Sequence, residues 1–326
     1  MLAAALAILG AAGCGSSVTD ADLRENPGTL VVPSESGEVS GLQGLVWTKD
    51  ASEIVFHSSQ LKAVSVGSHA VRPVWGESAV VNFAGPTVSG RIYFSTFLPT
   101  PSTSAEYAIG RVEPGTGVWE VLPLQAPALT IAIDVSPNER YVVGDAIYDL
   151  QTGGKASSFP YTPLGFSPDG NAFVARDAFT TALVVMDGQG SHQQLATSDE
   201  AYIAHRWALH VPLLLRRRYD AAKANIRLYE VDGLSSVSHD LAELNATSDA
   251  VYAKYSADGS LLGIWLQDGT LWKLYKIRAG GTPTFVASVR YDLGSHPTPP
   301  VFSPDGTSVA FFFFNPGRSL YVRSGI

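Results

Sequence analysis

The sequence of 326 residues contains one cysteine and few charged residues. A single cysteine excludes an intramolecular disulfide and any metal site that requires several cysteines. Charged residues make up 16% of the chain, whereas soluble domains have roughly 25%. Together with 45% hydrophobic residues, this low charge argues against disorder. The net charge of −8 argues against a nucleic-acid partner, because the chain as a whole would repel phosphates.

Known catalytic motifs are also missing from the sequence. It has no G-x-S-x-G nucleophile elbow, and no H-E-x-x-H zinc motif, P-loop or G-x-G-x-x-G turn. The seven histidines are scattered, and His205 and His210 would lie on opposite faces of a strand because they are separated by an odd number of residues. We therefore expect no catalytic residues of a known motif, no metal site and no cofactor.

Residues 2–13 are apolar or small, and Cys14 follows them directly. As a helix they would span about 18 Å, which is short of the roughly 30 Å hydrocarbon core of a bilayer. Their length instead suits the apolar region of a signal peptide. Ala11, Ala12 and Gly13 immediately before Cys14 resemble the lipobox of a bacterial lipoprotein signal.

That resemblance implies that residues 1–13 are a signal peptide, that Cys14 is lipidated and that residues 14–28 are a tether. The protein would then be exported and anchored in a bacterial cell envelope, at the outer membrane or the periplasmic face. Two features depart from the family: Ala11 stands where Leu is favoured, and a positively charged segment before the apolar run is missing. A simple secretory signal and a buried free thiol are the alternatives.

A turn motif recurs through the rest of the chain. The sequence S-P-D-G occurs at 167–170 and 303–306, each time after a Phe and before an apolar run. Variants and more degenerate copies occur at 46–50, 87–90, 136–139, 207–210 and 256–259. Pro presets φ, Asp bonds its own backbone and Gly accepts positive φ, so each copy predicts a tight reversal between strands. The mean spacing of about 42 residues fits a four-stranded propeller blade.

This pattern resembles the WD40-like repeat of TolB-type β-propellers, whose units read roughly F-S-P-D-G, an apolar strand and then L-Y-V-x-D. The resemblance covers residues 29–326, which we expect to form one all-β propeller domain. Seven four-stranded blades are predicted, with six as the alternative because TolB-type propellers usually have six. The last repeat lacks a fourth strand, so residues 29–34 are predicted to pair as its outermost strand and close the ring.

In such a ring the S-P-D-G turns should share one face, which we call the turn face. The loops joining second to third strands, and those linking blades, should share the opposite face, which we call the loop face. Because binding residues concentrate on loops held by a rigid scaffold, the loop face is the predicted partner-binding surface. Its candidate residues are Tyr107, Arg176, Asp177, Arg216, Arg218, Tyr219, Tyr291 and His296.

The basic run 216–218 is expected in one of these loops, either simply solvated or as a docking patch for an acidic partner or for lipid headgroups. Strand alternation separately places Asp134, Arg206 and Lys254 near the core position of a first strand. These three side chains either line the central channel or pair with each other across neighbouring blades.

The resemblance to TolB-type propellers implies that the protein interacts with other proteins of the cell envelope. The first functional hypothesis is therefore a non-enzymatic, membrane-anchored and monomeric scaffold that binds a protein or peptide. The alternative is an enzyme, a lyase or hydrolase acting on a glycan or lactone at the channel mouth, because one fold can host many unrelated sites. A structural envelope component without a dedicated ligand is the third hypothesis.

Overall fold

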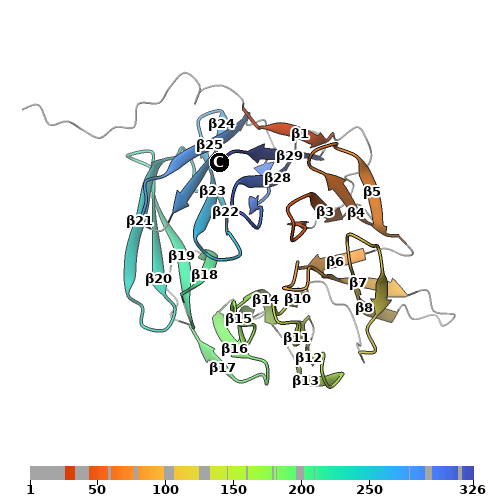
Figure 1. The fold of residues 1–326 in the computed structure, drawn as a ribbon. Coiled ribbons are helices and arrows are strands. Elements are labelled where there is room, and N and C mark those ends of the chain that lie inside the picture. Colours follow the sequence, from red (N-terminus) through yellow and green to blue (C-terminus); the bar gives the residue numbers. More distant parts are fainter. Residues whose placement is uncertain are drawn as a thin grey trace, which may run out of the picture.

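Among the residues that the structure describes, the regular elements are all β-strands, arranged as radial sheets around a central opening (Figure 1). The computed structural model describes residues 26–33, 44–57, 60–76, 80–98, 106–124, 133–144, 146–158, 161–177, 180, 182–195, 202–208, 210–278, 280–290, 296–314 and 318–326. Within this part of the chain, no helix has the length and apolar character needed to cross a membrane. Cys14 and the predicted signal peptide lie outside the described residues.

Seven antiparallel sheets form the ring, one for each predicted repeat. Blade 1 comprises β2 (Leu45–Trp47), β3 (Glu53–His57), β4 (Leu61–Ser65) and β5 (Val71–Trp75). Blade 2 comprises β6 (Val80–Ala84), β7 (Ile92–Leu98), β8 (Glu106–Val112) and β9 (Trp119–Val121). Blade 3 comprises β10 (Asp134–Val135), β11 (Tyr141–Val143), β12 (Ala146–Asp149) and β13 (Gly154–Ser158). Blade 4 comprises β14 (Tyr161–Phe166), β15 (Ala172–Asp177), β16 (Leu183–Asp187) and β17 (His192–Gln194). Blade 5 comprises β18 (Tyr202–Ala208), β19 (Val211–Asp220), β20 (Asn225–Asp232) and β21 (Ser238–Asn245). Blade 6 comprises β22 (Val251–Tyr255), β23 (Leu261–Asp268), β24 (Leu271–Arg278) and β25 (Thr284–Arg290). The prediction of seven blades is confirmed, and the six-blade alternative is wrong.

Blade 7 joins the two ends of the described chain. It contains β26 (His296–Pro297), β27 (Val301–Phe302), β28 (Ser308–Phe314), β29 (Arg318–Ser324) and, as its outermost strand, β1 (Thr29–Val32). β26 and β27 both pair with β28 and together take the place of one first strand. Pro299 and Pro300 lie in the break between them, where neither can donate a ladder hydrogen bond.

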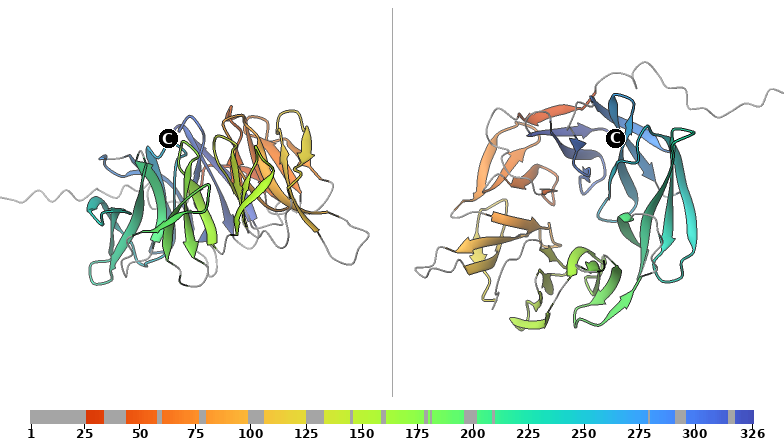
Figure 2. Two further views of the ribbon diagram at one scale, coloured as in Figure 1. Left: turned by 90° about the horizontal axis from the view of Figure 1, so that it is seen from below. Right: turned by 180° about the vertical axis from the view of Figure 1, so that it is seen from behind.

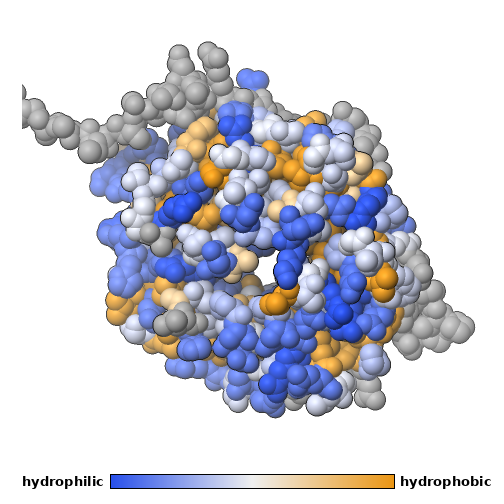
Figure 3. Space-filling model, in the orientation of Figure 1, coloured by the Kyte–Doolittle hydropathy of each residue, from blue (hydrophilic) through white to orange (hydrophobic). Residues whose placement is uncertain are grey.

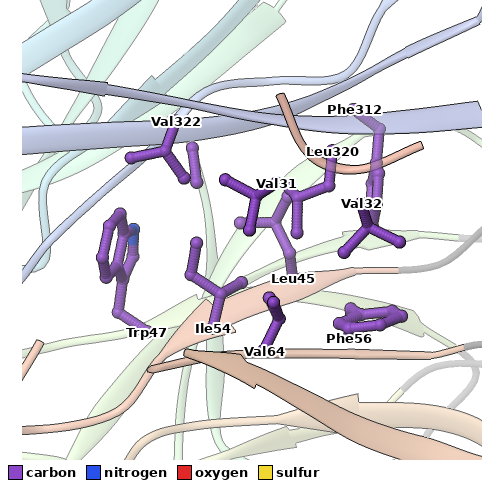
Figure 4. Close-up of a cluster of buried hydrophobic side chains, with 11 residues drawn as sticks. Val31, Val32, Leu45, Trp47, Ile54, Phe56, Val64, Phe312, Leu320 and Val322 are labelled. Atoms are coloured by element: carbon purple, nitrogen blue, oxygen red, sulfur yellow. The ribbon is translucent and has the colours of Figure 1, made fainter. Parts of the chain in front are cut away.

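The predicted closure by the N-terminal strand is confirmed. β1 pairs antiparallel with β29, with Thr29 opposite Val322 and Val32 opposite Leu320. Val31 and Val32 are buried in a core that also takes side chains from blades 1 and 7 (Figure 4). The strand therefore contributes both backbone pairing and apolar packing at the junction of the first and last blades.

The S-P-D-G turns use the predicted chemistry. In blade 4 the Ser167 hydroxyl donates to Asp169 Oδ1 at 2.6 Å, and the backbone N–H of Asn171 donates to the same oxygen at 3.1 Å. The Ala172 N–H donates back to Ser167 Oγ at 3.0 Å, and Gly170 has a φ of 72°. The same Ser–Asp bond recurs in blades 6 and 7, at 2.6 and 2.5 Å. Each turn thus satisfies its own polar groups before the second strand begins.

Neighbouring turns are also bonded to one another around the turn face. The Lys49 ammonium of blade 1 donates to the Val88 carbonyl of blade 2 at 2.7 Å. The Asn138 amide of blade 3 donates to the Asp169 carbonyl of blade 4 at 2.8 Å. Between blades 2 and 3, Glu139 accepts hydrogen bonds from Thr87 at 2.6 Å and from Ser89. The blades stand side by side around the ring, with hairpin turns at both faces (Figure 2).

Closure by β1 predicts a difference between two substitutions in the same strand. Val32→Ala removes a side chain that is 1% exposed, so unfolding by denaturant should become easier by about 2 kcal/mol. Leu30→Ala alters a side chain that is 43% exposed and should change stability by less than about 0.5 kcal/mol. Equal effects of the two substitutions would contradict a packed closing strand.

Candidate functional site

The centre of the ring holds a cavity of about 690 Å³. A hole at this position is visible in the space-filling view (Figure 3). First strands of the blades form much of its wall, with β18 and β22 contributing Tyr202–Trp207 and Ala253–Tyr255. Cationic, aromatic and small apolar side chains share the lining, and the volume is that of a pocket for a small ligand.

Arg206 stands in this wall with a carboxylate partner that the sequence analysis missed. Its Nε and Nη2 donate to the two carboxylate oxygens of Glu230 at 2.6 and 2.8 Å. Tyr255 of blade 6 donates its hydroxyl to the same carboxylate at 2.6 Å. Burial alone would raise the pKa of Glu230, but the hydrogen bonds from Arg206 and Tyr255 outweigh it and lower the pKa. The three side chains therefore form a neutralised link between blades 5 and 6.

Lys254 and Asp134 attract each other electrostatically across the ring without forming an ion pair. Lys254 lines the cavity from blade 6, while Asp134 begins the first strand of blade 3. Burial raises the pKa of Asp134 to about 6, although the Val135 N–H at 2.9 Å, the Lys254 charge and the Phe166 N–H oppose the rise. Burial likewise lowers the pKa of Lys254, against the attraction of Asp134. The two groups attract each other at longer range than an ion pair.

An aromatic and cationic group lies at the end of the cavity nearer the loop face. Tyr202 and His205 hydrogen-bond at 2.8 Å through the phenol oxygen and the ring Nδ1. The imidazole also donates to the backbone of Gly165, and burial lowers the pKa of His205 to about 4, so the ring is neutral near pH 7. The Arg176 guanidinium carbon lies 5.4 Å from the centre of the Tyr202 ring, a cation–π arrangement.

Of the three side chains predicted for the channel, the structure brings only two together in the cavity wall. Arg206 and Lys254 line one cavity, whereas Asp134 is placed beside it and interacts with Lys254 from a blade that is not its neighbour. Arg206 pairs within its own blade with Glu230. Glu230 escaped prediction because it lies in a third strand, and nothing in the repeat pattern marks a third-strand side chain as reaching the channel wall.

The loop-face candidates lie mostly in strands. Arg176 and Asp177 end β15, while Arg216, Arg218 and Tyr219 lie within β19. The basic run was expected in a loop, which is wrong: β19 continues to Asp220, because the second and third strands of blade 5 stay paired through Asp220 and Asn225. Arg216 is accordingly buried, with 3% of its surface exposed.

The other loop-face candidates are a stacked histidine and two tyrosines. His296 stacks on the Phe314 ring with centroids 4.6 Å apart, and lies 6.0 Å from the ring of Tyr252. Tyr107 has its backbone in β8, but its side chain is outside what the structure describes. Tyr291 lies outside the described residues altogether.

The turn face carries a feature that sequence reasoning missed. A second cavity, of about 590 Å³, opens among its turns and includes Pro86, Pro137, Pro168 and Pro304. Six of the seven large hydrophobic side chains that are exposed in the described part of the chain stand at or beside turns of this face: Val71, Val88, Val118, Trp119, Leu234 and Val237. Apolar residues inside turns were the available signal, and they do not follow the strand periodicity from which surface positions were assigned.

Comparison with known proteins supports the fold alone. No family model and no curated protein matches the sequence. Similar solved structures include the β-propeller domain of Cps50 (Swd1) from Myceliophteria thermophila, with a TM-score of 0.58, 11% identity and coverage of 92% of this chain and 99% of that one. A chain of the mitotic checkpoint complex gives a TM-score of 0.54 at 10% identity, covering 93% and 94%. TolB from Acinetobacter baumannii gives a TM-score of 0.47 at 16% identity, and the match covers 86% of this chain and 78% of that one.

The link between Arg206 and Glu230 generates a stability prediction. Glu230→Gln leaves a largely buried guanidinium without its counter-charge, so we expect a loss of about 2–3 kcal/mol at pH 7 in denaturant unfolding. Because the folded pKa of Glu230 is lowered, its contribution is present above the unfolded pKa of about 4.3 and is lost as pH falls through the folded value.

Asp240→Asn is the matched control, since it removes the carboxylate partner of Arg227, a pair that is half exposed or more on both sides. Its cost should be much smaller than that of Glu230→Gln, because a solvent-exposed ion pair contributes little to stability. A Glu230→Gln variant as stable as the Asp240→Asn variant would contradict the buried link. The seven closed blades, their turn chemistry and the matching solved structures together show that the chain is a seven-bladed β-propeller.

Proposed function

We propose that this propeller is a non-enzymatic scaffold that binds a protein partner in a bacterial cell envelope, where a lipid on Cys14 anchors it. The observation that carries the binding part is that six of the seven exposed large apolar side chains of the described chain stand on the turn face, three of them in blade 2. Val88 and Val118 of blade 2 are 66% and 65% exposed, and exposed apolar groups that cluster mark interaction sites. Trp119, next to Val118, supplies the kind of aromatic anchor that dominates protein interfaces.

The rigid ring supports this use of the turn face. The Lys49–Val88 and Asn138–Asp169 bonds fix the turns of adjacent blades relative to one another. A partner that contacts several turns therefore meets a preorganised surface and pays little for ordering it. Around the apolar residues, ion pairs such as Arg91–Glu113 at 3.5 Å provide a polar rim, which is the usual surround of an interface core.

The partners of the channel groups favour binding over the enzymatic alternative. A lyase or hydrolase site would need an acid and a base that converge on a substrate. Here His205 bonds a phenol, Tyr202, and the Glu230 carboxylate is occupied by Arg206 and Tyr255. Among the described residues, no three side chains of His, Cys, Asp or Glu are grouped as a metal site would require.

The interaction proposal predicts different effects for variants of the two faces. Val88→Asp with Val118→Asp places charges on the turn face, whereas Arg218→Ser with Lys223→Ser alters the loop face. In affinity capture from the native envelope, followed by mass spectrometry, the turn-face variant should lose proteins that the wild type and the loop-face variant both retain. Identical captured sets for both variants, or no specific protein with the wild type, would contradict the proposal. Loss only in the loop-face variant would move the interface to that face.

The anchor has its own test. Mass spectrometry of the mature N-terminus should show a chain that begins at Cys14 and carries lipid, and Cys14→Ser should release the protein from the membrane fraction. Cleavage elsewhere, or an unmodified cysteine, would contradict anchoring while leaving the interaction proposal standing.

A further inference from the structure

A groove of about 500 Å³ lies on the turn face between blades 1 and 2. The turn that follows β2 contributes Thr48 to Ser52 to its lining, without Ala51. Two turns of blade 2 contribute the rest: Gly90 from the turn between the first and second strands, and Pro114 and Gly115 from the turn between the third and fourth. All three turns belong to the described part of the chain, so the shape of the groove is set by residues whose positions are known.

Hydrogen bonds across the blade boundary hold the two sides of the groove together. Arg72 of β5 donates from Nε to the Glu53 carboxylate at 2.8 Å and from Nη2 to the Pro114 carbonyl at 2.7 Å. The Lys49 ammonium donates to the Val88 carbonyl of blade 2 at 2.7 Å. The groove is therefore preformed, and a ligand does not have to order it.

Exposed valines stand at both turns of blade 2. Val88 lies two residues before Gly90, in the same turn. Val118 closes the turn that contains Gly115, where its carbonyl accepts from the Glu113 N–H at 2.9 Å. Both valine side chains are largely exposed. A ligand in the groove can cover them and gain the free energy of burying apolar surface.

The charges in the lining balance one another. The Glu53 carboxylate is paired with Arg72, and the neighbouring residues Lys49 and Asp50 carry opposite charges. A charged ligand would gain little net attraction here and would lose part of its hydration. The groove is therefore complementary to an uncharged ligand.

Gly115 offers free backbone groups to such a ligand. Its N–H and C=O make no hydrogen bond with any residue of the described chain. A helix uses its backbone groups internally, whereas an extended segment has N–H and C=O groups that need partners. The groove thus suits an extended segment better than a helix.

We propose that this groove is where the protein partner docks, through a short, extended and uncharged segment whose apolar side chains pack on Val88 and Val118. The inference rests on the proposed function, because it assigns to the turn-face interface a particular groove and a particular kind of ligand.

A random dodecapeptide library displayed on phage is the probe, selected on the immobilised protein. Enriched peptides should share at least two apolar residues and carry no net charge, and fluorescence anisotropy of a labelled one gives its affinity. Gly115→Gln should weaken that affinity at least about tenfold, or about 1.4 kcal/mol, because a Cβ at this position meets no atom within 4 Å and the longer side chain extends into the groove. Gly115→Ala adds only the Cβ and should bind almost as the wild type does. Val118→Asp, at a side chain that is 65% exposed, should weaken the same peptide.

Gly67→Gln is the matched control. Gly67 holds the corresponding position in blade 1, where the His69 N–H bonds the Ser65 carbonyl as the Gly117 N–H bonds that of Glu113 in blade 2. A Cβ at Gly67 also meets no atom within 4 Å, but Gly67 does not line the groove. Its variant should bind the peptide with unchanged affinity, and both glutamine variants should unfold at the same denaturant concentration as the wild type.

The groove is overturned as the docking site if the wild type enriches no peptide, if the enriched peptides are charged, or if Gly115→Gln and Gly67→Gln bind alike. Affinity capture separates this failure from that of the proposed function. If Gly115→Gln retains the envelope proteins that the Val88→Asp, Val118→Asp variant loses, the groove is wrong while the turn-face interface stands.

Discussion

The pairing of β1 with β29 is the constraint on which the rest of the structure depends. Each blade packs against two neighbours, so the ring has no open junction only when the last blade gains its outer strand from the start of the chain. The entropic cost of bringing together segments nearly 300 residues apart grows only slowly with loop length. Once the ring is closed, the angular position of every first strand is fixed, and with it the placement of Arg206 and Lys254 around one cavity.

Departures from the repeat motif are compensated across blade boundaries. Blade 3 has Glu139 at the position of the turn glycine, and its φ is 57°. For a residue other than glycine, this left-handed backbone conformation costs about 1 kcal/mol. Its carboxylate accepts hydrogen bonds from Thr87 and Ser89 in the turn of blade 2, which lacks the usual Asp. The acid missing from one turn is thus supplied by its neighbour, and two degenerate repeats stabilise each other.

Local turn chemistry and repeat spacing were sufficient to predict the ring, because each S-P-D-G turn is decided by four adjacent residues. The strand that closes the ring was predictable since residues 29–32 had no other repeat to complete. The contacts of Arg206 could not be predicted, because Glu230 and Tyr255 lie on other strands and the packing of the blades determines whether they meet Arg206. The apolar turn face was missed for a related reason. Val88 and Leu234 lie in turns, where the alternation of buried and exposed residues along a strand does not apply. The sequence pattern therefore does not predict that apolar side chains from several blades share one face.

The apolar turn face and the central cavity therefore share one scaffold, and both require a ring that stays closed. Native-state hydrogen exchange measures this most directly, because it gives the opening free energy of each strand separately. The account predicts that the amides that pair β1 with β29 exchange only with the free energy of global unfolding shared by the core strand β23. Exchange of β1 through a low-energy local opening, while β23 stays protected, would contradict a ring held closed by its N-terminal strand.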